Sequence, residues 1–250
     1  MLDQPAMASE TLPLLLLPGT LADDTVFAPV LERLGMTSTW MRMAGATSAT
    51  EMARIILAAA PQRFTLIGFS LGAIMSLEVV AQAPERVERL ALLGCNARDL
   101  TSEKAAARRA TVPIAERLGL TSYIDGVWQT SVPAHRRNDQ ELRAQLHQMA
   151  TDTPMDAFRD QIEMAIDRVD SRPRLELLDM PVLVACGAED GICPPELSAE
   201  IAGAIPGATL AIVEAAGHYL TLDQPDEVAR LLREWLTQPT RTSRLAKEFS

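Results

Sequence analysis

Short apolar runs alternate along the chain with segments of helical periodicity. Six runs are expected to be strands: residues 12–17, 37–43, 64–68, 87–93, 181–186 and 208–214. Most of them carry apolar residues at successive positions without strict alternation, which is typical of strands that are covered on both faces. The pattern therefore predicts an α/β fold, with a mostly parallel central sheet and helices on both faces.

Apolar stripes with helical spacing lie between the predicted strands, and their role is to pack crossover helices against the sheet. They comprise Met52, Ile55 and Ile56, then Ile74, Leu77 and Val80, and finally Val228, Leu231, Leu232 and Trp235.

Residues 99–179 break this rhythm, because helical patterns follow one another there without a strand, as with Leu142, Leu146 and Met149. Ligands bind at the carboxyl ends of the strands in open α/β sheets, and an insertion between two strands is expected to cover that edge. We predict a core of residues 1–98 and 180–238, a helical lid of residues 99–179, and a polar C-terminal tail of residues 239–250.

Composition and charge narrow the classes of function. With 48% hydrophobic and 22% charged residues, the 250-residue chain can bury a full core. Its formal net charge of −10 argues against nucleic acid or an anionic membrane as the main partner. A small uncharged or weakly charged molecule is the expected substrate.

Cysteine usage and the early apolar run indicate the cellular compartment in which the protein is expected. Cys95, Cys186 and Cys193 are odd in number and lack metal-ligand spacing, so we expect neither a disulfide framework nor a zinc site. The run at residues 12–17 is too short to span a bilayer and follows acidic residues, unlike a signal peptide. A cytoplasmic protein is expected.

Ser70 is the candidate nucleophile. It is centred in Gly68-Phe69-Ser70-Leu71-Gly72, between a predicted strand and a predicted helix. A nucleophile elbow needs small residues two positions before and after the serine, because the turn is tight. The five-residue pattern alone arises by chance in about one chain of this length in ten, so its context matters. A dinucleotide-binding turn is disfavoured, because Ser70 replaces the glycine that would face the pyrophosphate.

A serine hydroxyl needs a base, and the base needs an acid that orients it. His218 is the candidate base, because it follows the last predicted strand in a glycine-containing turn. Asp190, in the turn after the strand at 181–186, is the first choice of acid, with Glu189 and Asp99 as alternatives. The order Ser, acid, His is the one that the α/β-hydrolase fold uses.

Two backbone N–H groups are candidates for stabilising an oxyanion. Leu71 follows the nucleophile at the start of a predicted helix. Thr20 follows Pro18-Gly19 at the end of the first strand, and Leu21 is the second choice there.

Together these motifs resemble the α/β-hydrolase superfamily, in the compact lidded group of bacterial esterases and enol-lactonases. The resemblance covers nearly the whole chain and rests on residues 14–19, 68–73 and 187–195, and on Gly217-His218 with Gln224-Pro225. Pro18-Gly19 departs from the His-Gly of many relatives. Only about ten residues precede the first strand, too few for the antiparallel hairpin of many relatives, so one sheet edge is expected to be shortened.

The resemblance implies a serine hydrolase that cleaves a small ester, lactone or thioester through an acyl-enzyme, without a metal or an organic cofactor. The same fold and triad also support C–C bond hydrolysis and perhydrolase or cofactor-free haloperoxidase chemistry, and some relatives only bind ligands. The sequence leaves these alternatives and the oligomeric state open. The predicted substrate contacts are Leu21, Phe69, Trp128 and Met149, although the last two are equally suited to packing between lid helices.

Overall fold

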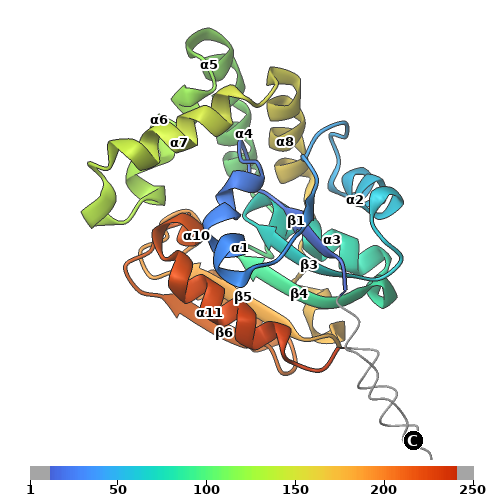
Figure 1. The fold of residues 1–250 in the computed structure, drawn as a ribbon. Coiled ribbons are helices and arrows are strands. Elements are labelled where there is room, and N and C mark those ends of the chain that lie inside the picture. Colours follow the sequence, from blue (N-terminus) through green and yellow to red (C-terminus); the bar gives the residue numbers. More distant parts are fainter. Residues whose placement is uncertain (1–11, 241–250) are drawn as a thin grey trace, which may run out of the picture.

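Six parallel strands form the centre of the protein (Figure 1). The computed structural model describes residues 12–240, in which they lie in the order β2-β1-β3-β4-β5-β6. Every neighbouring pair is parallel, so the predicted α/β fold and its six strands are confirmed. Among residues 12–240, no antiparallel strand flanks β2. The strands are Leu14–Leu17 (β1), Thr39–Trp40 (β2), Phe64–Phe69 (β3), Val87–Leu93 (β4), Val182–Gly187 (β5) and Thr209–Val213 (β6).

The edge strand β2 is much shorter than the predicted range of 37–43. Only Thr39 and Trp40 pair with β1. Met43 is buried in the loop beyond them, where its apolar side chain joins the core without belonging to a strand. The apolar pattern was therefore produced partly by a buried loop.

Successive residues of the inner strands enter two different cores. In β1, Leu14 and Leu16 face one core, whereas Leu15 and Leu17 face the other. Helices cover both sides, which explains why successive positions are apolar. Ala28–Leu34 (α1) and Pro225–Leu236 (α11) pack on the first side, and Ala49–Ala59 (α2), Leu71–Gln82 (α3) and Pro195–Ala204 (α9) on the second.

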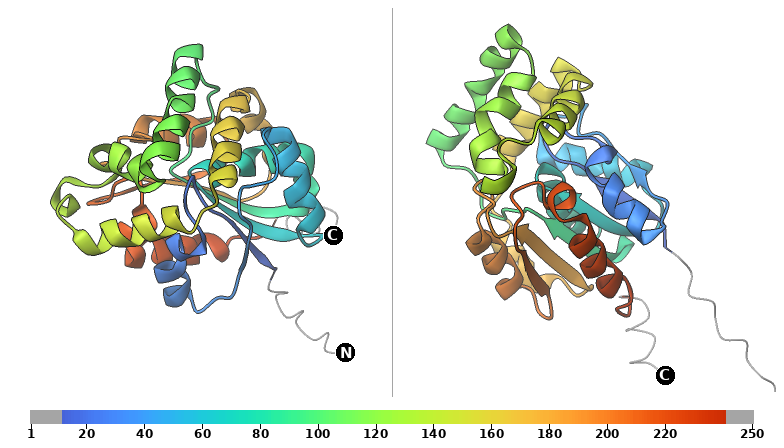
Figure 2. Two further views of the ribbon diagram at one scale, coloured as in Figure 1. Left: turned by 90° about the horizontal axis from the view of Figure 1, so that it is seen from above. Right: turned by 60° about the vertical axis from the view of Figure 1, so that its left-hand side comes forward.

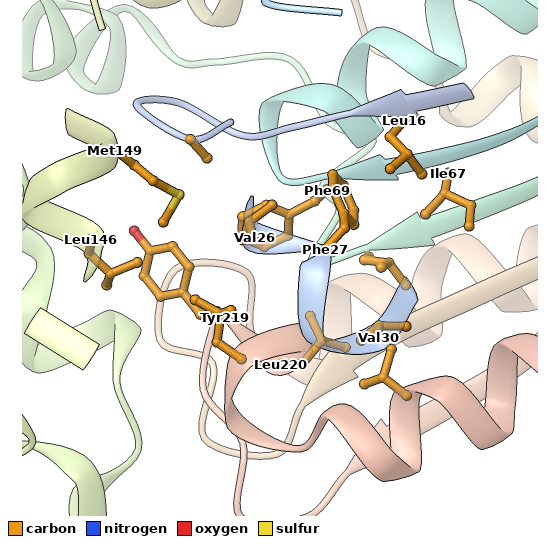
Figure 3. Close-up of a cluster of buried hydrophobic side chains, with 14 of the residues drawn as sticks. Leu16, Val26, Phe27, Val30, Ile67, Phe69, Leu146, Met149, Tyr219 and Leu220 are labelled. Carbon is orange, nitrogen blue, oxygen red and sulfur yellow. The ribbon is translucent and has the colours of Figure 1, made fainter. Parts of the chain in front are cut away.

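The segment between β4 and β5 is helical and gathers over one end of the sheet (Figures 1 and 2). Many of its inner side chains join the first core, where Leu146 and Met149 lie beside Tyr219 (Figure 3), whereas Met164 and Ala165 of the last long helix join the second. The division into a core and a lid at residues 99 and 179 stays a prediction. The helices here are Ser102–Arg109 (α4), Thr111–Leu118 (α5), Thr121–Ser131 (α6), Gln140–Thr151 (α7) and Met155–Asp167 (α8).

Shorter helices complete the fold: Asp24–Val26 (η1), Pro84–Arg86 (η2), Ala134–Arg136 (η3), Arg172–Leu177 (η4) and Leu220–Asp223 (α10). None of the helices in residues 12–240 has the length and hydropathy needed to cross a membrane. The predicted tail of residues 239–250 lies outside the described residues from position 241 onward.

Candidate active site

Ser70 lies at a sharp turn between β3 and α3. Its φ of 52° and ψ of −114° place a non-glycine residue in a backbone conformation that side chains rarely adopt. The Ser70 N–H donates a hydrogen bond of 2.9 Å to the carbonyl of Leu93, which ties the turn to β4. The turn presents the half-buried Ser70 side chain at the carboxyl end of β3.

Gly68 and Gly72 make this turn possible, because each packs against backbone. A Cβ on Gly68 would lie 2.6 Å from Cα of Ala73 in α3, and a Cβ on Gly72 would collide with the carbonyl of Leu17 at the end of β1. Neither neighbour is the movable end of a side chain. The two glycines let α3 approach β3 and β1 closely enough to hold Ser70 in its strained position.

His218 forms hydrogen-bonding contacts with both of its predicted partners. Its Nε2 lies 2.8 Å from Oγ of Ser70, and its Nδ1 lies 2.8 Å from Oδ2 of Asp190. The three residues come from the loops after β6, β3 and β5, respectively. The residues His218 and Asp190 are 5% and 2% exposed, so water competes little for these bonds.

The backbone of its own turn holds the Asp190 carboxylate. Oδ1 accepts hydrogen bonds of 2.8 Å from the N–H groups of Ile192 and Cys193, leaving Oδ2 for His218. The alternative acid Glu189 accepts from the N–H of Ala134 instead. Asp99 is exposed and forms no hydrogen bond with His218 in the described structure. Asp190 is thus the carboxylate brought to the imidazole.

Helix α6 and a buried carboxylate hold the His218 loop. The N–H of His218 donates to the carbonyl of Ser131 at the end of α6, 2.7 Å away. The N–H of Gly217 donates to Oδ2 of Asp223, 2.9 Å away. Burial raises the pKa of Asp223, while the Gly217 N–H and the Arg136 guanidinium oppose this shift. The loop that carries the imidazole is therefore fixed on two sides.

Two backbone N–H groups near Ser70 remain available for an oxyanion. In residues 12–240, those of Thr20 and Leu71 have no backbone or side-chain acceptor. The N–H of Leu21, in contrast, donates to Oε1 of Gln161 on α8. Thr20 and Leu71 both line the cavity that contains Ser70, and Leu21 does not. The geometry favours Thr20 over Leu21.

The cavity beside Ser70 has a volume of about 390 Å³, within the usual range for small-molecule sites. Residues after β1 and β3 form its floor, and helices α4, α5, α6 and α8 supply much of its wall. A smaller hollow adjoins it at Phe69, His218 and Tyr219. No group of three or more His, Cys, Asp or Glu side chains that could hold a metal ion occurs in the part of the chain described.

Comparison with known proteins gives the family of the chain. A family model for the alpha/beta hydrolase fold matches residues 38–225. The chain belongs to the alpha/beta hydrolase family.

This alpha/beta hydrolase has curated relatives of low identity. It is 24% identical over 220 residues to a bifunctional biotin biosynthesis protein of Teredinibacter turnerae, covering 80% of this chain and 38% of that protein. It is 26% identical over 185 residues to a pimeloyl-[acyl-carrier protein] methyl ester esterase of Neisseria meningitidis, covering 68% of this chain and 56% of that protein. The chain thus spans less than two thirds of either relative.

A solved structure matches this hydrolase over a larger share of both chains than these curated relatives do. A thermophilic esterase from Thermogutta terrifontis superimposes with a TM-score of 0.81 and 25% identity, over 90% of this chain and 89% of that one.

Only one of the four predicted substrate contacts lines a cavity of this hydrolase. Phe69 lines the hollow beside His218. Leu21, Trp128 and Met149 line neither space, because each is buried in the core of the first sheet side. The indole N–H of Trp128 donates to the carbonyl of Arg137. For Trp128 and Met149, packing explains the observed position.

Sequence reasoning missed several residues that line the cavities. Arg108, Tyr123, Val127 and Ile192 border both of them, and Lys104 and Arg168 border the larger one. Most of these lie on the helices between β4 and β5, where no local motif distinguishes an inward side chain from an outward one. One available signal was the rarity of lysine, since Lys104 is one of two in the chain.

Proposed function

We propose that this alpha/beta hydrolase is a serine hydrolase that cleaves a carboxylic ester, lactone or thioester of a small molecule. The observation that carries the proposal is the position of His218, whose two ring nitrogens each lie 2.8 Å from a partner, Ser70 and Asp190. This arrangement suits a nucleophile, a base and an orienting acid.

In the first half of the reaction, Oγ of Ser70 attacks the carbonyl carbon while Nε2 of His218 takes its proton. Asp190 accepts the Nδ1–H, keeps the imidazole in the required tautomer and stabilises the imidazolium. The N–H groups of Thr20 and Leu71 donate to the oxyanion of the tetrahedral intermediate. His218 then protonates the leaving alcohol, thiol or ring oxygen, and the acyl group remains on Ser70.

In the second half, water attacks the acyl-enzyme with His218 as the base, and the acid product leaves. Each step needs only groups of this chain and water. The names of the relatives, a methyl ester esterase and an esterase, support ester cleavage among the chemistries that such a triad performs.

A fluorophosphonate probe followed by intact-mass measurement tests the proposal. We expect one adduct per chain on the wild-type protein and none on Ser70→Ala. The control is Ser131→Ala, which removes the other serine hydroxyl near the imidazole. Labelling of Ser70→Ala would assign the nucleophile to another residue. No labelling of any of the three proteins would contradict an activated serine and favour a ligand-binding role.

A substrate panel then separates the chemistries. The proposal predicts turnover of short-chain esters, thioesters or lactones without peroxide. Turnover that required peroxide, or that was confined to a C–C bond substrate, would replace ester hydrolysis with one of the alternatives.

A further inference from the structure

Three cations line the cavity that contains Ser70. Lys104 and Arg108 lie on α4, and Arg168 directly follows α8. The two helices are in contact and lie side by side above the sheet (Figure 1). No aspartate or glutamate is among the residues that line this cavity, all of which belong to the described part of the chain. Its wall is therefore cationic, although the chain as a whole carries a net charge of −10.

Arg168 is built into the wall. It is 6% exposed, and its Nε donates a hydrogen bond of 2.8 Å to the carbonyl of Arg98. Burial lowers its pKa, and the charge of Arg108 lowers it further, while the charge of Asp99 opposes the shift. A buried guanidinium is costly unless something compensates its charge.

Within residues 12–240, no ion pair involves any of the three cavity cations, although acidic partners are plentiful nearby. Arg109, next to Arg108, binds both oxygens of Glu163, and Arg98 binds Glu200. Arg98 and Arg109 are exposed neighbours of these residues and each pairs with an acidic side chain, whereas the three cations at the cavity do not.

We propose that Arg168, Arg108 and Lys104 form a subsite for an oxyanion, a carboxylate or a phosphate, on the substrate that Ser70 cleaves. The proposal rests on the proposed function. A guanidinium offers paired N–H groups that match either anion, and a buried site strengthens such bonds. Because the three cations and Ser70 border one cavity of about 390 Å³, a single small molecule can contact both. A substrate with such an anionic group would differ from the uncharged or weakly charged molecule expected from the net charge.

Matched esters test this proposal on the full chain. Mono-4-nitrophenyl glutarate carries a terminal carboxylate, 4-nitrophenyl 4-phosphonobutanoate carries a phosphonate, and 4-nitrophenyl valerate is the neutral reference. We expect one or both anionic esters to have kcat/KM at least about tenfold above the neutral one. The better of the two identifies the anion, and equal or lower values for both would overturn the subsite.

Variants test whether these cations produce the preference for the anionic ester. Arg168→Gln is expected to lower kcat/KM for the preferred anionic ester at least about tenfold while leaving the neutral ester within about twofold. Because Arg168 is buried, the double variant Lys104→Gln/Arg108→Gln provides a second test at exposed and half-buried positions. Arg109→Gln is the matched control and should change neither ester. Equal losses on both esters, or none, would contradict the proposal.

Binding separates failure of the subsite from failure of the proposed hydrolysis. Titration calorimetry with glutarate and with methylphosphonate on Ser70→Ala is expected to show binding that Arg168→Gln in the same background loses. Binding without turnover of any ester would keep the subsite and reject the hydrolase. Hydrolysis of the neutral ester without anion binding would reject the subsite alone.

Discussion

The backbone N–H of Leu21 donates a hydrogen bond to Oε1 of Gln161, 3.0 Å away and 140 residues later in the chain. Nε2 of Gln161 donates in turn to the carbonyl of Met43, 3.2 Å away. The fully buried amide therefore joins α8 to the loop after β1 and to the loop after β2. The first of these loops carries Thr20, so helix α8 holds the loop of one of the two proposed oxyanion donors in place.

Replacing Gln161 with leucine is expected to reduce catalysis through the position of Thr20. Gln161→Leu leaves a buried N–H and a buried carbonyl without partners, which should lower the free energy of unfolding by about 1–3 kcal/mol. The loop should then hold the Thr20 N–H less accurately, so kcat should fall at least about tenfold with little change in KM. Urea unfolding and steady-state ester hydrolysis measure the two effects.

The matched control for this variant is Gln148→Leu. Gln148 is exposed on α7 and bonds only to Asp152 within its own segment. The Gln148→Leu variant should therefore leave kcat unchanged. If Gln161→Leu lost stability but kept the wild-type ratio of kcat to KM, Gln161 would have a purely structural role.

Asp190→Asn should abolish most activity while the fold persists. The amide presents an N–H or a weaker acceptor to His218, and the imidazole loses the tautomer that accepts the Ser70 proton. A fall in kcat of about 10⁴ is expected, by analogy with the corresponding change in a serine protease. The measurement is kcat for a 4-nitrophenyl ester together with circular dichroism.

Glu189→Gln and Asp99→Asn are the controls for the acid, and both should stay within about threefold of wild type. Glu189 bonds to the Ala134 backbone, and Asp99 is exposed. A large loss in either variant, with Asp190→Asn near wild type, would move the role of the acid to that carboxylate.

Gly72→Ala should unfold or severely destabilise the protein. Its Cβ would collide with the backbone carbonyls of Leu17, the last residue of β1, and of Pro18, which follows it, and neither can rotate away as a side chain could. The cost is expected to be at least about 3 kcal/mol in urea unfolding. Gly126→Ala is the control, because Gly126 lies in α6 and a Cβ added there would meet no atom within 4 Å. Gly126→Ala should raise the free energy of unfolding by about 0.5–1 kcal/mol. Equal losses of stability in Gly72→Ala and Gly126→Ala would show that close packing around Gly72 is not the reason for the loss.

The sequence was informative wherever one local pattern decides the structure. The inner strands could be predicted because both faces are buried, and Ser70 because Gly68 and Gly72 are required by its turn. Strand β2 was overestimated, since a buried loop at Met43 resembles a strand in its apolar pattern.

The remaining features of the site depend on tertiary placement. Gln161 and Arg168 act from α8 and its end on groups that are distant in the chain, and nothing beside them in the sequence marks them. Trp128 and Met149 were expected at the substrate because large apolar lid residues often line such cavities. The same property also places them in the core, and only the arrangement of the helices distinguishes the two outcomes.

The three thiols of the native protein should resist alkylation. Cys95, Cys186 and Cys193 are free and buried. Burial raises the pKa of Cys95 to about 12, and burial followed by the charge of Asp190 raises the pKa of Cys193 well above its ordinary value. A raised pKa keeps the thiol neutral, so at pH 8 only about one Cys95 in 10⁴ is the reactive thiolate. Iodoacetamide at pH 8 should add nothing to the native chain and three groups to the denatured chain, by intact mass.

The position of Cys193 sharpens this prediction, because that thiol also lines the Ser70 cavity. Access alone would make it the first cysteine to react, whereas the raised pKa of its thiol opposes that reaction. The pH dependence separates the two effects: labelling controlled by ionisation stays negligible at pH 8 and rises steadily as the pH approaches 12. A single modification of native protein at pH 8, mapped to Cys193, would show instead that the cationic cavity wall activates that thiol against the effects of burial and Asp190.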